Sequence, residues 1–164
     1  MNFADLDPAL RPLLDRYLTP EDRKLIEPVL TDLGATAAGE LDRLAALAER
    51  NPPSLRQYAP NGERVDEVEF HPAYDRMLDI GLGRFGLAAL SNRGGVLGWA
   101  DRAPHMVKHV LSYLFTQAEF GIGCPINMTD SAARVLRMFD PDRYAAEIAA
   151  LTSTDGPPYT TGAM

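Results

Sequence analysis

The stretch AEFGIGCPINMTDSAARVL, residues 118–136, joins two segments whose apolar residues recur at helical spacing. Before it, this spacing predicts a helix over about residues 104–121. After it, a second helix is predicted around residues 125–138. Two amphipathic helices joined by a short glycine-containing connection indicate an all-α bundle. The apolar stripe of the first helix consists of Val107, Val110, Leu111, Leu114, Phe115, Ala118 and Ile122.

The N-terminal part of the chain continues the helical pattern. We predict a helix over roughly residues 28–49, with Pro28 in its first turn and the sequence NPP at residues 51–53 after its end. A shorter helix is predicted over residues 7–17, with Pro8 at its first position. The apolar stripe of the longer helix is formed by Leu33, Ala37, Leu41, Leu44 and Ala48.

One segment does not follow the helical pattern. An Asn-Gly turn at residues 61–62, with alternating residues on either side, predicts a small surface β-hairpin near residues 56–70. The last predicted helix covers residues 141–151, with Pro141 near its start. Helical spacing also returns after the hairpin, where one face is formed by Tyr74, Met77, Leu78, Gly81, Leu82, Phe85, Ala88 and Ala89.

The composition is that of a globular chain, with 164 residues, 46% hydrophobic and 24% charged. We expect one domain over residues 1–152, followed by a linker over residues 153–164 that is polar and rich in proline and glycine. The net charge of -7 repels phosphate backbones, so we expect no nucleic-acid binding by this chain alone. No uncharged run approaches the ~20 residues that cross a bilayer, so no membrane association is expected. The absence of a secretory signal and the single cysteine predict a cytoplasmic location.

Three chemical motifs each have a structural alternative. Residues 81–86, GLGRFG, match the dinucleotide pattern G-x-G-x-x-G, but no strand is predicted before them, which favours close helix packing. His105 and His109 have the spacing of a metal-binding pair, but no third ligand is near in sequence, which favours a solvated helix face. Cys124, before Pro125, would need a nearby base for catalysis, and burial as a small hydrophobe is the alternative.

The helix after Pro125 carries a face of mixed character. Met128 and Ala132 are i,i+4 neighbours, and Thr129 and Ala133 repeat this spacing beside them. A thioether, a hydroxyl and small side chains suit a mostly apolar ligand wall with few polar groups. Packing in the core is the alternative that the same pattern allows.

Three sequence blocks stand in a distinctive order. They are N-P-P at residues 51–53, G-x-R-x-D-x-V-x-F-H-P-A at residues 62–73 and C-P-I-x-M-T at residues 124–129. With these blocks, nearly the whole chain resembles the N-terminal helical domain of acyl-CoA dehydrogenases, in the branch related to the alkylation-response protein AidB. The resemblance implies an up-and-down helical bundle.

The resemblance also implies a chemistry for the complete protein. Members of this family use FAD to remove two hydrogens across the Cα–Cβ bond of an acyl-CoA thioester. They add a middle β-domain and a C-terminal helical domain, and they usually assemble as homotetramers. These domains, an acyl-CoA-like molecule and further copies of the protein are therefore the implied partners. By motif alignment, Met128, Thr129 and Ala132 face the acyl chain, and Pro125 and Ile126 adjoin them.

The same resemblance implies what this chain lacks. In the family, the tail leads into a strand with the Thr-Glu and Gly-Gly-Ser-Asp segments that hold the flavin, and the C-terminal helices carry the catalytic carboxylate. We therefore expect a fragment or one piece of a split protein, inactive alone, with no catalytic residue and a linker toward a missing β-domain. Two alternatives are a non-enzymatic helical interaction module and part of an alkylation-damage-response protein.

Overall fold

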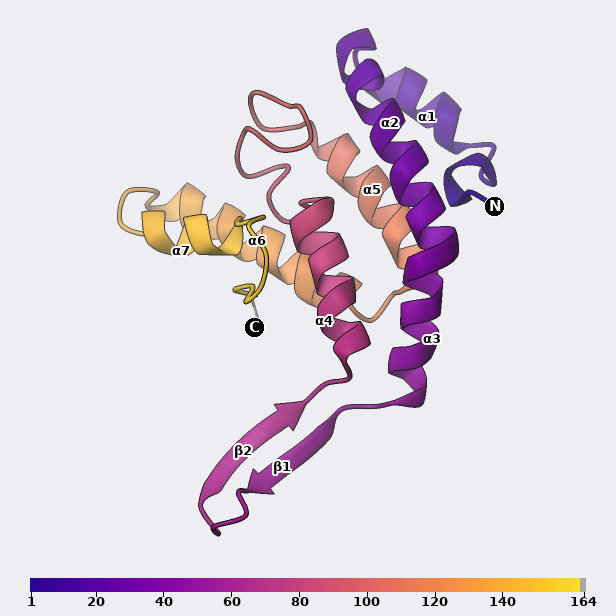
Figure 1. Ribbon diagram of the computed structural model, residues 1–164. Helices are drawn as coiled ribbons and strands as arrows, with labels where there is room; N and C mark the ends of the chain where they lie inside the picture. The colour runs from indigo at the N-terminus through magenta and orange to yellow at the C-terminus, as the bar shows by residue number, and fades with distance from the viewer. Residues whose placement is uncertain (163–164) are drawn as a thin grey trace.

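The computed structural model describes residues 1–162 and shows a helical bundle from which one β-hairpin projects (Figure 1). This arrangement confirms the predicted mainly helical fold with one hairpin. Residues 163–164, the end of the predicted linker, lie outside the described part of the chain. The elements are a 3-10 helix (Phe3–Asp5), α1 (Leu10–Tyr17), α2 (Pro20–Thr36), α3 (Asp42–Arg50), β1 (Ser54–Tyr58), β2 (Arg64–Glu69), α4 (Pro72–Leu78), α5 (His105–Ala118), α6 (Gly123–Phe139) and α7 (Ala145–Leu151).

The start of α2 corrects the prediction of a helix that begins near Pro28. Thr19 caps the helix, because its Oγ1 accepts the backbone N–H of Asp22 at 3.1 Å. Pro20 then occupies the first turn, where a missing N–H has no cost. Pro28 consequently lies inside α2 and does not mark its beginning.

A continuous helical rod connects α2 to α3. Ile26, Leu30 and Leu33 are fully buried, so packing of this face offsets the hydrogen bond that Pro28 cannot make. The rod widens into a π-helical turn at Ala37–Leu41 and continues as α3. It crosses α5 in the middle of the molecule, and these two helices supply much of the core (Figure 1).

The helix that follows the hairpin is shorter than predicted. After α4, a π-helical segment covers Asp79–Arg84 and then ends. Gly86 takes a φ of +54°, a left-handed conformation that glycine adopts readily and that terminates a helix. Ala88 and Ala89 are buried as predicted, but they reach the core from a turn and not from a helix face.

Two further helices begin later than predicted, because an aspartate caps a turn in front of each. Asp7 Oδ1 accepts the N–H two residues later at 2.8 Å, and α1 begins at Leu10. Asp140 Oδ1 accepts the N–H three residues later at 3.1 Å, and α7 begins at Ala145. Pro141 therefore belongs to the turn before α7, and its predicted place in the first turn of that helix is wrong.

The hairpin extends away from the helices, with every residue of both strands exposed (Figure 1). Leu55 pairs with Val68, and Arg56 pairs with Glu67 in the antiparallel register. The Arg56 guanidinium forms ion pairs with Glu67 and with Glu69. One face of the hairpin is therefore charged, and the other presents Leu55 and Val68 to solvent.

Candidate functional site

The sequence analysis predicted a ligand wall at the start of α6. In the structure, the residues of this predicted wall differ in how deeply they are buried. Ile126 is 2% exposed and belongs to the core, where its methyl group lies against Gly81. Thr129 has no exposed surface. Pro125, Met128 and Ala132 are half-buried and form the outer layer of this face.

The segment that follows α7 runs back over α6. The backbone N–H of Gly162 donates to Thr129 Oγ1 at 3.0 Å, and the Thr129 hydroxyl donates to the Pro125 carbonyl at 2.7 Å. A side chain at position 162 would come within 2.9 Å of the Ala132 methyl group. A glycine against a small alanine thus permits this close approach, and the Thr129 hydroxyl fixes it.

An apolar cavity of about 440 Å³ lies between α6, α7 and this returning segment. Its volume falls in the range of ligand pockets, roughly 300–1,000 Å³. Ala132 lines it, whereas Met128 does not. The remaining described residues around it are mostly small or apolar: Leu136, Ala146, Glu147, Ala150, Leu151, Thr160 and Gly162.

Three more hydrogen bonds fasten the returning segment to the bundle. The Tyr159 hydroxyl donates to Asp79 Oδ1 at 2.7 Å, and burial together with this bond raises the pKa of Tyr159 to about 12. Arg93 Nε donates to the Thr152 carbonyl at 2.8 Å, and its terminal nitrogen donates to Thr154 at 2.9 Å. Residues 152–162 therefore follow a defined path along the helices.

A buried ion pair joins α5 to α6 beneath this face. Lys108 Nζ lies 2.9 Å from Asp130 Oδ2, and their side chains are 6% and 10% exposed. Asp130 Oδ1 also accepts the Ser91 hydroxyl at 2.6 Å and the Asn92 amide at 3.0 Å. The pair thus ties both helices to the irregular segment that precedes α5.

Sequence reasoning missed this pair. Its only signals are one lysine beside an apolar stripe and one aspartate beside Thr129. Because the two residues lie on different helices, only the tertiary arrangement brings them together. The buried carboxylate and ammonium groups satisfy each other, so we assign them a structural role and no chemistry.

The three weaker motifs gain no support as catalytic or metal sites. Cys124 is exposed, and the rings of His105 and His109 lie 6.5 Å apart. Burial lowers the pKa of His109, with smaller contributions from Lys108 and His105. Within residues 1–162, no group of three or more His, Cys, Asp and Glu side chains could hold a metal ion.

The GLGRFG motif lies at the C-terminal end of the helical segment Asp79–Arg84 and continues into the turn that follows it. The N–H of Phe85 donates to the Ile80 carbonyl at 3.0 Å, and that of Leu87 donates to Gly81 at 2.9 Å. A pyrophosphate needs free N–H groups at the start of a helix, and these amides are already bonded. Gly81 instead permits contact with Ile126 and Phe115, which a larger residue would prevent.

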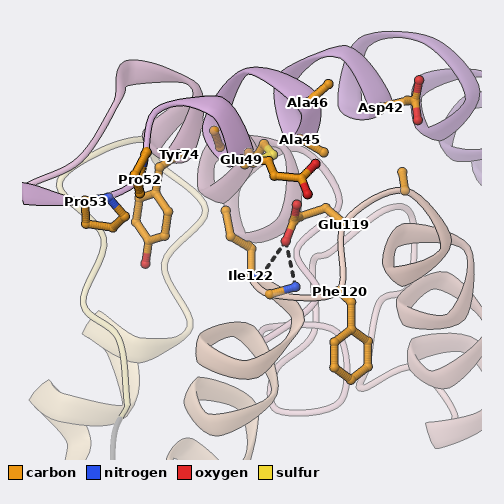
Figure 2. Close-up of a pocket in the computed structure, with 14 residues that line it drawn as sticks. Asp42, Ala45, Ala46, Glu49, Pro52, Pro53, Tyr74, Glu119, Phe120 and Ile122 are labelled. Carbon is orange, nitrogen blue, oxygen red and sulfur yellow. Dashed lines mark hydrogen bonds between the residues drawn. The ribbon is translucent and has the colours of Figure 1, made fainter.

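A second and larger hollow lies on another face, between α3, α4 and the α5–α6 connection (Figure 2). Its volume is about 640 Å³. We call it the α3–α4 groove, and the sequence analysis did not anticipate it. It is lined by Asp42, Ala45, Ala46, Ala48, Glu49, Pro52, Pro53, Tyr74, Met77, Ala118, Glu119, Phe120, Gly121 and Ile122.

No helix within residues 1–162 has the length and apolar character needed to cross a membrane.

Comparison with known proteins gives consistent matches. Residues 1–155 match the family described as "Adaptive response protein AidB N-terminal domain". Over 123 residues, 73% of this chain, the sequence is 32% identical to the "Putative acyl-CoA dehydrogenase AidB" of Escherichia coli strain K12. The match covers 21% of that protein, so the chain spans about a fifth of this curated relative.

Solved structures share the fold. The structure described as "Bd2924 apo-form" superposes with a TM-score of 0.85 at 26% identity, over 98% of this chain and 31% of its own. ACDH-11 of Caenorhabditis elegans, described as a complex with C11-CoA, gives a TM-score of 0.79 at 23% identity. That match covers 96% of this chain and 27% of ACDH-11, and an identity this low shows the fold alone.

Proposed function

Because this chain belongs to the family of AidB N-terminal domains, we propose that it is the helical N-terminal domain of an FAD-dependent acyl-CoA dehydrogenase-like flavoprotein. Its relatives are between three and four times longer, since 98% of this chain covers 31% of one solved chain and 123 matched residues cover 21% of the curated protein. In this proposal, a β-domain and a C-terminal helical domain complete the protein, and the complete protein is a homo-oligomer. Activity belongs to that assembly.

FAD is held by those other domains in this proposal. Residues 81–86, the chain's dinucleotide-like motif, do not fit a pyrophosphate because they lie at the C-terminal end of a helical segment, whereas a pyrophosphate binds the free N–H groups at a helix start. We therefore assign no step of the flavin chemistry to residues of this chain.

The proposed contribution of this chain is one wall of the acyl pocket, formed by α6. Met128 and Ala132 lie on the surface of this wall, next to Pro125, while Thr129 and Ile126 support it from below. The observation that carries this proposal is the apolar cavity of about 440 Å³ beside Ala132. A methyl group at position 132 leaves room there that a larger side chain would fill.

Chain-length selectivity of the complete protein tests this wall. We expect Ala132→Phe to weaken the binding of a long-chain acyl-CoA by about tenfold, or about 1.4 kcal/mol, because the ring fills the cavity. A short-chain acyl-CoA should lose much less affinity. Calorimetric titration with a series of acyl-CoA lengths measures both values.

Ser131→Phe is the matched control, because Ser131 is exposed on the same helix and does not line the cavity. It should leave both affinities unchanged. Equal losses for short and long chains in Ala132→Phe, or the same selectivity change in the control, would contradict the proposed wall.

A further inference from the structure

The described residues that line the α3–α4 groove carry a net negative charge. Asp42, Glu49 and Glu119 place three carboxylates on it, and none of them takes part in an ion pair within residues 1–162. The described residues that line it include no lysine or arginine. Figure 2 shows Glu49 and Glu119 pointing toward each other from opposite sides of the groove. Like charges that converge in this way favour a cation between them.

One of these carboxylates is held in place. Glu119 Oε1 accepts the backbone N–H of Gly121 at 2.6 Å and that of Ile122 at 3.2 Å (Figure 2). Because both donors belong to the turn between α5 and α6, the carboxylate is oriented before any ligand arrives. A fixed acceptor loses little conformational entropy on binding.

The rest of the groove is apolar. Ala45, Ala48, Met77 and Ile122 form its walls, and the Tyr74 ring adds an aromatic surface. Phe70 stacks on Tyr74 with ring centroids 4.2 Å apart, which restrains the tyrosine ring. An apolar surface with a few converging carboxylates complements a molecule that has an aliphatic body and a positively charged end.

The size of the groove favours a small molecule over a protein partner. Its volume of about 640 Å³ lies within the usual range of small-molecule pockets, roughly 300–1,000 Å³. Its 14 lining residues are fewer than the roughly 20–30 residues that each side of a stable protein interface supplies.

We propose that the α3–α4 groove binds a small amphiphilic organic cation, a primary ammonium group on an aliphatic chain. The ammonium group lies between Glu49 and Glu119, and the aliphatic chain lies against Ala45, Met77 and Ile122. This site is separate from the cavity beside Ala132, and it does not depend on the proposed acyl-CoA function.

The test compares three probes with the same octyl body: n-octylammonium, n-octanoate and 1-octanol. Each is titrated into the 164-residue chain at low ionic strength and below its micelle concentration, with the alanine methyl resonances followed by NMR. We expect n-octylammonium to bind about tenfold more tightly than 1-octanol, and n-octanoate to bind least. The shifted methyl groups should be those of Ala45, Ala46, Ala48 and Ala118.

Charge-neutral variants show whether the two glutamates cause this preference. The double variant Glu49→Gln and Glu119→Gln should bind n-octylammonium and 1-octanol equally, and a glutamine at position 119 can still accept the two backbone N–H groups. The matched control is Glu21→Gln with Glu63→Gln, which removes the same charge from two exposed positions outside the groove. It should keep the preference for the ammonium probe.

Three outcomes would overturn the proposal. They are n-octanoate binding as tightly as n-octylammonium, an unchanged preference in the double glutamine variant, and methyl shifts confined to Ala132, Ala146 and Ala150 of the other cavity.

Discussion

Residues of α6 that belong to one sequence pattern differ in how deeply their side chains are buried. Met128 and Ala132 are half-buried on the outer side of α6, whereas Thr129 is fully buried and uses its hydroxyl within the protein. The pattern predicted a face with a thioether, a hydroxyl and small residues, but only Ala132 of these side chains lines the cavity between α6 and α7. It could not reveal that Gly162 covers Thr129, because 33 residues separate the two in sequence.

Tyr159 offers a test of the returning segment at the level of one residue. Its pKa is about 12 in the folded chain and about 10 when unfolded, so its contribution to stability is complete below pH 10 and is lost as the pH rises through 12. Tyr159→Phe removes the bond to Asp79 and should lower the free energy of unfolding by about 1 kcal/mol below pH 10. This deficit should shrink between pH 10 and 12.

Urea denaturation of both proteins from pH 8 to 12 measures the deficit. Tyr17→Phe is the control, because Tyr17 is exposed and should show no such dependence on pH. A deficit that stays constant across this range would mean that Tyr159 does not titrate in the way its burial and hydrogen bond imply.

At the scale of elements, the existence of helices was predictable and their ends were not. Apolar spacing identified α2, α5 and α6, because each helix carries a buried stripe whose residues recur every three or four positions. Leu30, Leu111 and Ala133 belong to these three stripes. The predicted helix ends were wrong where a capping side chain sets the first turn. Thr19 starts α2 earlier than its interior proline suggested, and Asp140 delays α7.

The buried Lys108–Asp130 pair gives a test of how α5 and α6 are joined. Lys108→Met leaves the Asp130 carboxylate buried without its cation, and we expect the free energy of unfolding to fall by about 3 kcal/mol. Lys24→Met removes an equal charge from an exposed position of α2 and should change stability by less than about 0.5 kcal/mol. Chemical denaturation of the two variants measures both values, and equal effects would contradict a structural role for the pair.

At the scale of the whole molecule, the described surface carries exposed apolar side chains on α6 and on the hairpin. In the C-terminal half of α6, the side chains of Val135, Met138 and Phe139 are 62%, 73% and 77% exposed. Solvent-exposed apolar side chains of this size on one helix are typical of a contact surface. The hairpin is equally exposed, and a two-stranded sheet gains stability when a partner covers it.

The three sequence blocks indicate a specific protein family, whereas the apolar periodicity indicates only a fold class. Periodicity and composition predict a helical bundle with several weak motifs. The family match identifies this bundle as an AidB N-terminal domain. The α3–α4 groove escaped prediction, because residues from α3, α4 and the turn after α5 form it only in the folded chain.

The most direct test of the account is to combine this chain with the β-domain and C-terminal helical domain of a full-length relative. The visible absorbance of flavin after gel filtration would report bound cofactor, with the isolated 164-residue chain as the control. We predict that the combined domains elute together, carry FAD and transfer hydrogens from an acyl-CoA to an acceptor, while the isolated chain stays colourless. Tight FAD binding by the isolated chain, or no association with those domains, would contradict the account.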